Sequence, residues 1–312
     1  MKTCILQNGR LSPAFETVLA TEFDLCPLWQ EPDPSAFLAQ HGEKYVGLVT
    51  SGPVGASAAL ISALPSLQII CSRGVGHEKI DVKAAQSRGI LVSNTPGVLT
   101  DCVADLAFGA LLSVGRGICA ADRFVRRGDW QHQRFSLTVR VSGKKLGIVG
   151  MGGVGRAIAR RAAGFDMEVR YNSRRMVPEV THDFEASLTK LAHWADFLVV
   201  SAPGGPDTRH LISAEVLAAL GGKGFLVNVS RGTLVDEQVL VQALATGMIS
   251  GAALDVFEDE PCVPEALLAM ENVVLLPHIA SGTKETFQAM EALVLENLRS
   301  FFSIGRLLTP IF

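Results

Sequence analysis

The sequence predicts an α/β protein of two domains, each built on a mostly parallel sheet that helices cover. Short apolar runs alternate with longer segments of helical spacing along nearly all of the 312 residues. One long apolar segment, residues 101–118, separates an earlier set of these runs from a later set. The composition is typical of a compact α/β protein, because 48% of the residues are hydrophobic, 19% are charged and 30 are glycines.

The first set of apolar runs predicts five strands and two helices. Strands are expected at residues 3–6, 25–28, 46–50, 68–71 and 90–92. Helices are expected at residues 56–64 and 79–88, which have helical spacing and few breakers. Alternation of this kind favours parallel pairing, since a helix must carry the chain back between parallel strands.

The apolar segment 101–118 predicts a long buried helix that links the two domains, with Asp101 as its cap. The polar and aromatic segment 122–135 that follows is expected to be irregular. Six more strands are expected at residues 146–149, 168–171, 197–201, 225–229, 251–255 and 273–276. A final amphipathic helix, at about residues 284–303, ends at Gly305 and is expected to pack on the first domain.

Charge and composition give no sign of a nucleic-acid or membrane partner. The net charge is −3, no run of like charges resembles a nucleic-acid arm or a polybasic membrane patch, and no apolar stretch approaches the roughly 18 residues of a membrane span. The six cysteines are scattered without metal-ligand spacing, so we expect no metal site and no disulfides, but reduced, buried thiols. No signal peptide is recognised at the start, and a cytoplasmic location is expected.

A glycine loop follows the first strand of the second domain. Residues 150–155 read GMGGVG and lie between this strand and a helical segment. In such a context Gly150 permits a tight turn, Gly152 lets the backbone approach a pyrophosphate, and Gly155 lets helix and strand pack closely. The loop therefore predicts a dinucleotide site at a helix N-terminus, against the alternative of a glycine-rich turn without a ligand.

The end of the next strand predicts which dinucleotide binds. Folds that prefer NAD usually place an acid there, but this chain has Asn172, Ser173, Arg174 and Arg175. Guanidinium groups can bind a 2′-phosphate through charge-assisted hydrogen bonds, whereas a carboxylate would repel it. We therefore expect NADPH (NADP) to be preferred over NADH, the alternative being a solvated arginine pair on the surface.

Three ionisable residues follow the ends of later strands, where open α/β sheets bind ligands. They are Arg231, Glu260 and His278. Arginine can hold a carboxylate and polarise a carbonyl, histidine can deliver a proton near neutral pH, and a carboxylate can orient the histidine and raise its pKa. Each residue taken singly also has a structural interpretation, such as a solvated acidic loop around Glu260. Together, after a glycine loop, they predict reduction of a 2-keto acid.

Several motifs occur in a fixed order along nearly the whole chain. They are SRGVGHEKID at 72–81, NTPGVLTDCVAD at 94–105, GMGGVG at 150–155, NVSRG at 228–232, ALDVFEDEP at 253–261 and LLPHIASGT at 275–283. In these motifs the chain resembles the D-isomer-specific 2-hydroxyacid dehydrogenase family, and more narrowly its NADPH-dependent glyoxylate/hydroxypyruvate reductase branch.

The resemblance implies two Rossmann-like, doubly wound parallel-sheet domains, one flavodoxin-like and one dinucleotide-binding, with a cleft between them. Residues 1–99 and 285–312 would form the substrate-binding domain, and residues 100–284 the NAD(P)-binding domain. Arg231 would anchor the substrate, Glu260 would set the pKa of the histidine, and His278 would be the general acid. The cofactor contacts would be Gly150, Met151, Gly152, Gly153, Val154, Gly155, Asn172, Ser173, Arg174, Arg175, Thr100, Ala202, Pro203, Thr208, Val229, Ser230, Asp255 and Gly282.

The resemblance also implies where the substrate and a second subunit bind. The backbone around Val75 and Gly76 would hold the substrate carboxylate, and the loop 50–54, with Ser51 and Gly52, would close the pocket, next to Arg231 and His278. Members are usually homodimers, and Trp130 resembles a residue that reaches the partner's active site. The substrate is expected to be glyoxylate or hydroxypyruvate; hydroxyphenylpyruvate, 2-ketogluconate and a corepressor-like, dinucleotide-sensing role remain as alternatives.

Overall fold

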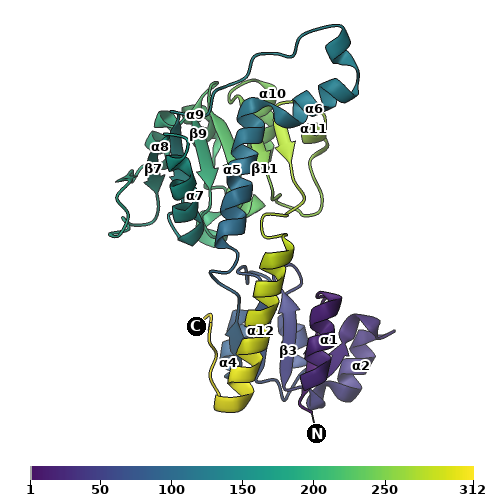
Figure 1. Cartoon of the computed structure of the whole chain (residues 1–312). Coiled ribbons are helices and arrows are strands. Elements are labelled where there is room, and N and C mark those ends of the chain that lie inside the picture. The colour runs from purple at the N-terminus through teal and green to yellow at the C-terminus, as the bar shows by residue number, and fades with distance from the viewer. Residues whose placement is uncertain (1) are drawn as a thin grey trace. The chain divides into compact units, whose positions relative to one another are not determined.

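The computed structural model describes residues 2–312, which form two compact units (Figure 1). One unit consists of the chain up to Leu99 together with Thr283–Phe312, and the other consists of Thr100–Gly282. Each contains one parallel sheet, which confirms the predicted α/β class.

The sheet of the first unit has five strands in the order β2-β1-β3-β4-β5. Every neighbouring pair is parallel, and the order reverses between β1 and β3, which places a topological switch point at their carboxyl ends. The strands are β1 (Cys4–Gln7), β2 (Asp24–Pro27), β3 (Gly47–Ser51), β4 (Ile69–Arg73) and β5 (Leu91–Ser93).

Helices cover both faces of this sheet. On one face α1 and α12 pack over β1, β3 and β4 and share a core that includes Phe15, Ile69 and Val294. On the other face α2, α3 and α4 pack around Leu48 and Ile70. The helices are α1 (Pro13–Glu22), α2 (Pro34–His41), α3 (Ala58–Ser62), α4 (Val82–Ser87) and α12 (Lys284–Ile304).

The sheet of the second unit has seven strands in the order β12-β11-β10-β9-β6-β7-β8, all parallel. The order reverses between β6 and β9, as it does in dinucleotide-binding sheets. The strands are β6 (Lys145–Val149), β7 (Glu168–Asn172), β8 (Asp183–Phe184), β9 (Phe197–Val200), β10 (Phe225–Asn228), β11 (Gly251–Leu254) and β12 (Val273–Leu275).

Alternate residues of one strand show how the helices of this unit divide between the two faces. Phe197 of β9 lies against Gly115 of α5. Helix α5 packs on α7, as Figure 1 shows. The next residue, Leu198, belongs to a core formed with α8, α9 and α10. The helices are α5 (Thr100–Arg116), α6 (Ile118–Arg126), α7 (Gly153–Ala163), α8 (Leu188–Trp194), α9 (Ala214–Leu220), α10 (Glu237–Ala245) and α11 (Glu265–Leu268).

The structure corrects two expectations around residues 101–135. The apolar helix ends at Arg116, because Gly117 adopts a left-handed conformation (φ 60°), and α6 extends through residue 126 into the segment expected to be irregular. Asp101 lies in the first turn of α5 and pairs with Arg160 and Arg161 of α7 instead of capping the helix.

The environment of the cysteines also differs from the expectation. No disulfide joins any of them within residues 2–312, and only Cys71 is buried, whereas Cys262 is exposed and the others are partly exposed. Within residues 2–312, no group of three or more metal-ligating side chains is present. No single described helix is long and apolar enough to cross a membrane; α5 and α6 meet that test only as a pair bent by 60°.

Candidate active site

The three glycines of the loop after β6 meet different physical requirements. Gly150 has φ +94°, and a Cβ there would lie 2.6 Å from the backbone of Ala202. A Cβ on Gly155 would lie 2.1 Å from the carbonyl oxygen of Gly150, so only glycine lets α7 begin so close to β6. Gly152 is exposed and has an ordinary backbone conformation, and a Cβ there would meet nothing within 4 Å. Neither the backbone nor its neighbours in the protein therefore require glycine at this position.

The start of α7 has the donors that a dinucleotide phosphate needs. Within residues 2–312, no oxygen accepts a hydrogen bond from the N–H groups of Met151, Gly152, Gly153 or Val154. These amides lie at the N-terminus of an 11-residue helix, whose dipole favours an anion there. Because the space over Gly152 is open and the amides are unpaired, this loop fits a pyrophosphate group.

The segment 172–175 follows β7, the neighbour of β6 in the sheet. The Asn172 amide donates hydrogen bonds to the backbone oxygens of Glu185 and Ala186, so this side chain holds the local backbone. Ser173 donates to the Arg175 carbonyl oxygen at 2.6 Å. Arg174 and Arg175 are exposed and form no ion pair with any described residue, which leaves both guanidinium groups available to an anion.

Arg231 lies on the loop after β10, and a glycine brings this loop against the loop after β11. The Arg231 side chain donates to the Ser230 carbonyl oxygen at 2.6 Å, and the Asn228 amide donates to the Arg231 carbonyl oxygen at 3.0 Å. A Cβ on Gly232 would lie 1.9 Å from the carbonyl carbon of Phe257. Glycine at this position therefore permits the close approach of the loops that carry Arg231 and Glu260.

Glu260 and His278 are in direct contact. His278 Nδ1 lies 2.7 Å from Glu260 Oε2, and Glu260 Oε1 accepts the Phe257 N–H at 3.1 Å. The hydrogen bond to Glu260 raises the pKa of His278 above its ordinary value; burial and the charge of Arg231 oppose this effect, and the charges of Glu260 and Asp255 add to it. The charges of Arg231, Glu260 and His278 thus act on one another.

Asp255 holds the turn that presents His278. Its carboxylate accepts the N–H groups of Ile279 and Ala280, each at 2.8 Å, and its carbonyl oxygen accepts the His278 N–H at 2.9 Å. His278 has φ 55°, a conformation that is uncommon for residues other than glycine. Burial of Asp255 raises the pKa of its carboxyl group despite these hydrogen bonds. The side chain of Asp255, expected to contact the cofactor, is therefore already occupied in shaping the turn.

A second histidine–carboxylate contact, which the sequence analysis missed, holds the same loop. His210 Nε2 lies 2.7 Å from Glu258 Oε1, and Arg209 pairs with the same oxygen at 2.9 Å. The Glu258 N–H donates to the Glu237 carboxylate at 3.3 Å. Glu258 is thus held from two sides, only two residues before Glu260. His210 has φ 51°, a conformation that no sequence pattern predicts for a histidine. The sequence therefore contains no signal for this contact.

The other expected cofactor residues lie around the same strand ends. The side chain of Thr100 lies next to Gly153, Ala202 lies next to Gly150, and the Thr208 hydroxyl donates to the Pro203 carbonyl oxygen. Val229 and Ser230 are buried directly after β10, and the Gly282 N–H donates to the carbonyl oxygen of Ile279.

The residues expected to hold the substrate lie at the carboxyl end of the first unit's sheet. A Cβ on Gly52, after β3, would lie 3.1 Å from the Gly76 carbonyl oxygen, so the loops after β3 and β4 are adjacent. Ser51 is buried, and Val75 is exposed. Within residues 2–312, no acceptor receives the N–H of Val75 or Gly76, whereas the Val75 carbonyl oxygen accepts the Asn94 amide at 2.7 Å.

The glycine loop and the strand order point to a known family, and a family model agrees with them. The model of the D-isomer specific 2-hydroxyacid dehydrogenase NAD binding domain matches residues 108–280. The chain belongs to this family. The predicted family and the oxidoreductase class of a 2-hydroxyacid dehydrogenase are therefore confirmed.

Individual members of the family are similar over almost their whole length. The chain is 46% identical over 307 residues to glyoxylate/hydroxypyruvate reductase A of Arabidopsis thaliana, and 47% identical over 307 residues to hydroxyphenylpyruvate reductase of Plectranthus scutellarioides; each match covers 98% of both chains. The solved structure of an NADPH-dependent glyoxylate/hydroxypyruvate reductase from Sinorhizobium meliloti, in complex with NADP and malonate, is 39% identical with a TM-score of 0.91. That match covers 100% of this 2-hydroxyacid dehydrogenase and 97% of the solved chain.

Proposed function

We propose that this 2-hydroxyacid dehydrogenase reduces glyoxylate or hydroxypyruvate to the D-2-hydroxy acid with NADPH, and that His278 is the proton donor. The observation that carries the proposal is the 2.7 Å contact between His278 and Glu260 at the carboxyl end of the sheet that carries the glycine loop. Two relatives named as glyoxylate/hydroxypyruvate reductases support the substrate class.

His278 delivers a proton to the alkoxide that forms on the substrate. Its Nδ1–H donates to the Glu260 carboxylate, so Nε2 remains for the substrate, and the carboxylate stabilises the imidazolium form. Bound NADPH supplies the hydride. Arg231, whose charge is permanent, holds the substrate carboxylate and polarises the carbonyl group.

The backbone amides of Val75 and Gly76 bind a carboxylate of the substrate, with Ser51 and Gly52 beside them. Their support is the pair of N–H groups that no described residue accepts. On this proposal, residues 1–99 and 285–312 form the substrate-binding domain, and residues 100–284 bind the cofactor.

The preference for NADPH over NADH depends on Arg174 and Arg175. Both are exposed after β7, no described acid pairs with them, and no acid stands at the end of that strand. The remaining cofactor contacts are those given by the family resemblance, in the loops after β6, β9, β10, β11 and β12 and at Thr100, the first residue of α5. We also propose that the enzyme is a homodimer.

A panel of 2-keto acids with both cofactors tests the proposal. Oxidation of NADPH is followed by its absorbance with glyoxylate, hydroxypyruvate, hydroxyphenylpyruvate and 2-ketogluconate, and then with NADH. We expect the highest kcat/KM with NADPH and one of the first two acids. A highest value with hydroxyphenylpyruvate, the substrate named for a 47% identical relative, would replace the proposed substrate. Absence of turnover with every acid would favour a dinucleotide-sensing role.

A further inference from the structure

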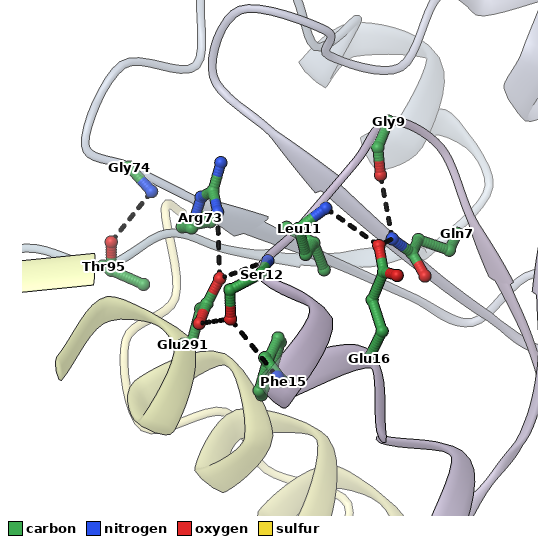
Figure 2. Close-up of polar contacts among 10 residues, drawn as sticks. All are labelled: Gln7, Gly9, Leu11, Ser12, Phe15, Glu16, Arg73, Gly74, Thr95 and Glu291. Carbon is green, nitrogen blue, oxygen red and sulfur yellow. Dashed lines mark hydrogen bonds and ion pairs between the residues drawn. The ribbon is translucent and has the colours of Figure 1, made fainter. Parts of the chain in front are cut away.

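A buried ion pair lies at the base of the loop that carries Val75 and Gly76. Arg73, the last residue of β4, contacts Glu291 of α12 at 2.9 Å, and the two side chains are only 14% and 5% exposed (Figure 2). The Arg73 guanidinium also lies over the Phe287 ring, 4.4 Å from its centroid. Its charge is therefore directed toward α12 and is neutralised there.

Glu291 joins this strand end to a second loop. Its two oxygens accept the Ser12 N–H at 2.9 Å and the Ser12 hydroxyl at 2.5 Å, in addition to Arg73 (Figure 2). Ser12 caps α1, and Glu16 of α1 accepts the N–H of Leu11 at 3.1 Å. The loop between β1 and α1 is thus fixed to the same carboxylate as the end of β4.

The hydrogen bonds continue from Arg73 into the loop itself. The Arg73 carbonyl oxygen accepts the Gly52 N–H at 3.0 Å. The Gly74 N–H donates to the buried Thr95 hydroxyl at 2.9 Å, as Figure 2 shows, and the Thr95 N–H donates to the Gly74 carbonyl oxygen. The loop is therefore held on both sides up to Val75, where the first unpaired amide occurs.

A buried ion pair contributes little net stability compared with apolar residues of the same volume, but it fixes geometry. We propose that Arg73 and Glu291 are positioning residues, which orient the Val75 and Gly76 amides toward the carboxylate of the 2-keto acid. This inference rests on the proposed function of those two amides. Arg73 acts through the backbone and does not touch the substrate.

Kinetics of Arg73→Gln against Arg299→Gln test the inference. Arg299 is a matched control, because it also forms an ion pair within this unit, between α12 and Glu22 of α1, but on the surface and away from the loop. In Arg73→Gln we expect KM for glyoxylate or hydroxypyruvate to rise about tenfold, with a smaller change in kcat, because binding rather than chemistry is affected. KM for NADPH and all constants of Arg299→Gln should stay near wild type, and Arg73→Lys should recover part of the loss.

Two outcomes would overturn the inference: an unchanged KM for the acid in Arg73→Gln, or an equal rise in Arg299→Gln. Exchange of the Gly74 amide, measured without any ligand, adds a readout of the loop itself. It should accelerate in Arg73→Gln and in Glu291→Gln but not in Arg299→Gln; unchanged exchange would also overturn the inference.

Failure of the proposed function can be told apart from failure of this inference. If the wild-type enzyme reduces none of the acids, the proposed function fails, and titration with oxalate then tests the carboxylate site. Weaker oxalate binding by Arg73→Gln than by Arg299→Gln would support the positioning role, and equal binding would overturn it.

Discussion

Two carboxyl groups near His278 differ in their tendency to ionise. Burial opposes ionisation of Glu260, but the hydrogen bond and charge of His278, the Phe257 N–H and the charge of Arg231 outweigh it and hold the pKa of Glu260 below its ordinary value. For Asp255 burial prevails, and its pKa is raised. Glu260 is therefore the carboxylate that stays charged beside the imidazole as the pH falls, and it stabilises the protonated histidine.

Replacement of Glu260 by glutamine should shift the pH dependence of the reaction. Reduction requires protonated His278, so kcat/KM is constant below the pKa of this group and falls as the pH rises above it. The Glu260 carboxylate raises the pKa of His278, and its loss should move the fall in rate to lower pH. A profile of kcat/KM against pH measures this shift. An unmoved profile would contradict the assignment.

Removal of the imidazole should affect the chemical step and leave cofactor binding almost unchanged. In His278→Ala we expect kcat to fall about 10²- to 10⁴-fold, because the proton must come from water. The dissociation constant of NADPH, measured by fluorescence titration, should stay close to that of the wild type. Equal losses in both quantities would make His278 a structural residue of the turn held by Asp255.

The residues of the candidate site were only partly predictable from the sequence. Arg231, Glu260 and His278 follow strand ends, so their proximity could be expected once the strands were recognised as parallel; their roles remain predictions. The Arg73–Glu291 pair joins residues 218 positions apart in the sequence. No local pattern marks such a pair, because the contact depends on how α12 lies against β4.

At the scale of elements, buried strands were easier to predict than exposed helices. Central strands such as β3, β9 and β10 are mostly apolar and buried along their whole length, since helices cover both faces of the sheets. Helix α6 has a single buried residue, Phe124, and its charged surface made the segment resemble an irregular loop. Helices α1 and α2 were missed although Ser12 and Asp33 cap them and a proline follows each cap, signals that the sequence does contain.

Two glycines of the loop after β6 should respond differently to alanine. Gly155→Ala places a methyl group against the Gly150 carbonyl oxygen and should lower the free energy of unfolding by about 1–3 kcal/mol. Gly152→Ala meets no protein atom, so Tm should be unchanged while the Kd of NADPH rises about tenfold or more. Thermal unfolding and cofactor titration measure both effects. Unaltered NADPH binding by Gly152→Ala would argue against a phosphate over this residue.

The loop after β7 should determine cofactor preference. Double replacement of Arg174 and Arg175 by alanine should raise the Kd or KM of NADPH about 10- to 100-fold, because each guanidinium group can form charge-assisted hydrogen bonds to the 2′-phosphate. NADH lacks that phosphate and should bind within about twofold of its wild-type value, which makes it the internal control. Similar losses for both cofactors would mean that the arginines only support the fold.

At the scale of the whole molecule, the pattern of apolar runs predicts parallel sheets, whereas the doubly wound order of their strands was implied only by the family resemblance. Alternating runs such as β3, α3 and β4 show that a crossover occurs, and they leave open on which side the next strand is added. The structure shows which strands flank the reversals: β1 and β3 in one sheet, and β6 and β9 in the other. They matter because open α/β sheets bind ligands where the strand order reverses, and the unpaired amides after β6 lie at such a point.

The assembly of the enzyme should depend on the exposed apolar face of α6. Ile118 and Val125 are seven residues apart, so they lie on one side of this helix, and they are 51% and 53% exposed. Trp130, which follows α6, is 68% exposed. Such a face favours burial against a second subunit. Light scattering should give about twice the 33.2 kDa of one chain for the wild type.

Val125→Asp should shift this mass toward that of a single chain, because a carboxylate buried in an apolar interface has no partner to offset its desolvation. Val18→Asp, at a valine of α1 that is 40% exposed, is the matched control and should leave the mass unchanged. A wild-type protein with the mass of one chain would exclude the homodimer. A dimer that persists in Val125→Asp would place the interface on a surface other than the exposed face of α6. That result would also argue against Trp130 as the residue that reaches the partner's active site.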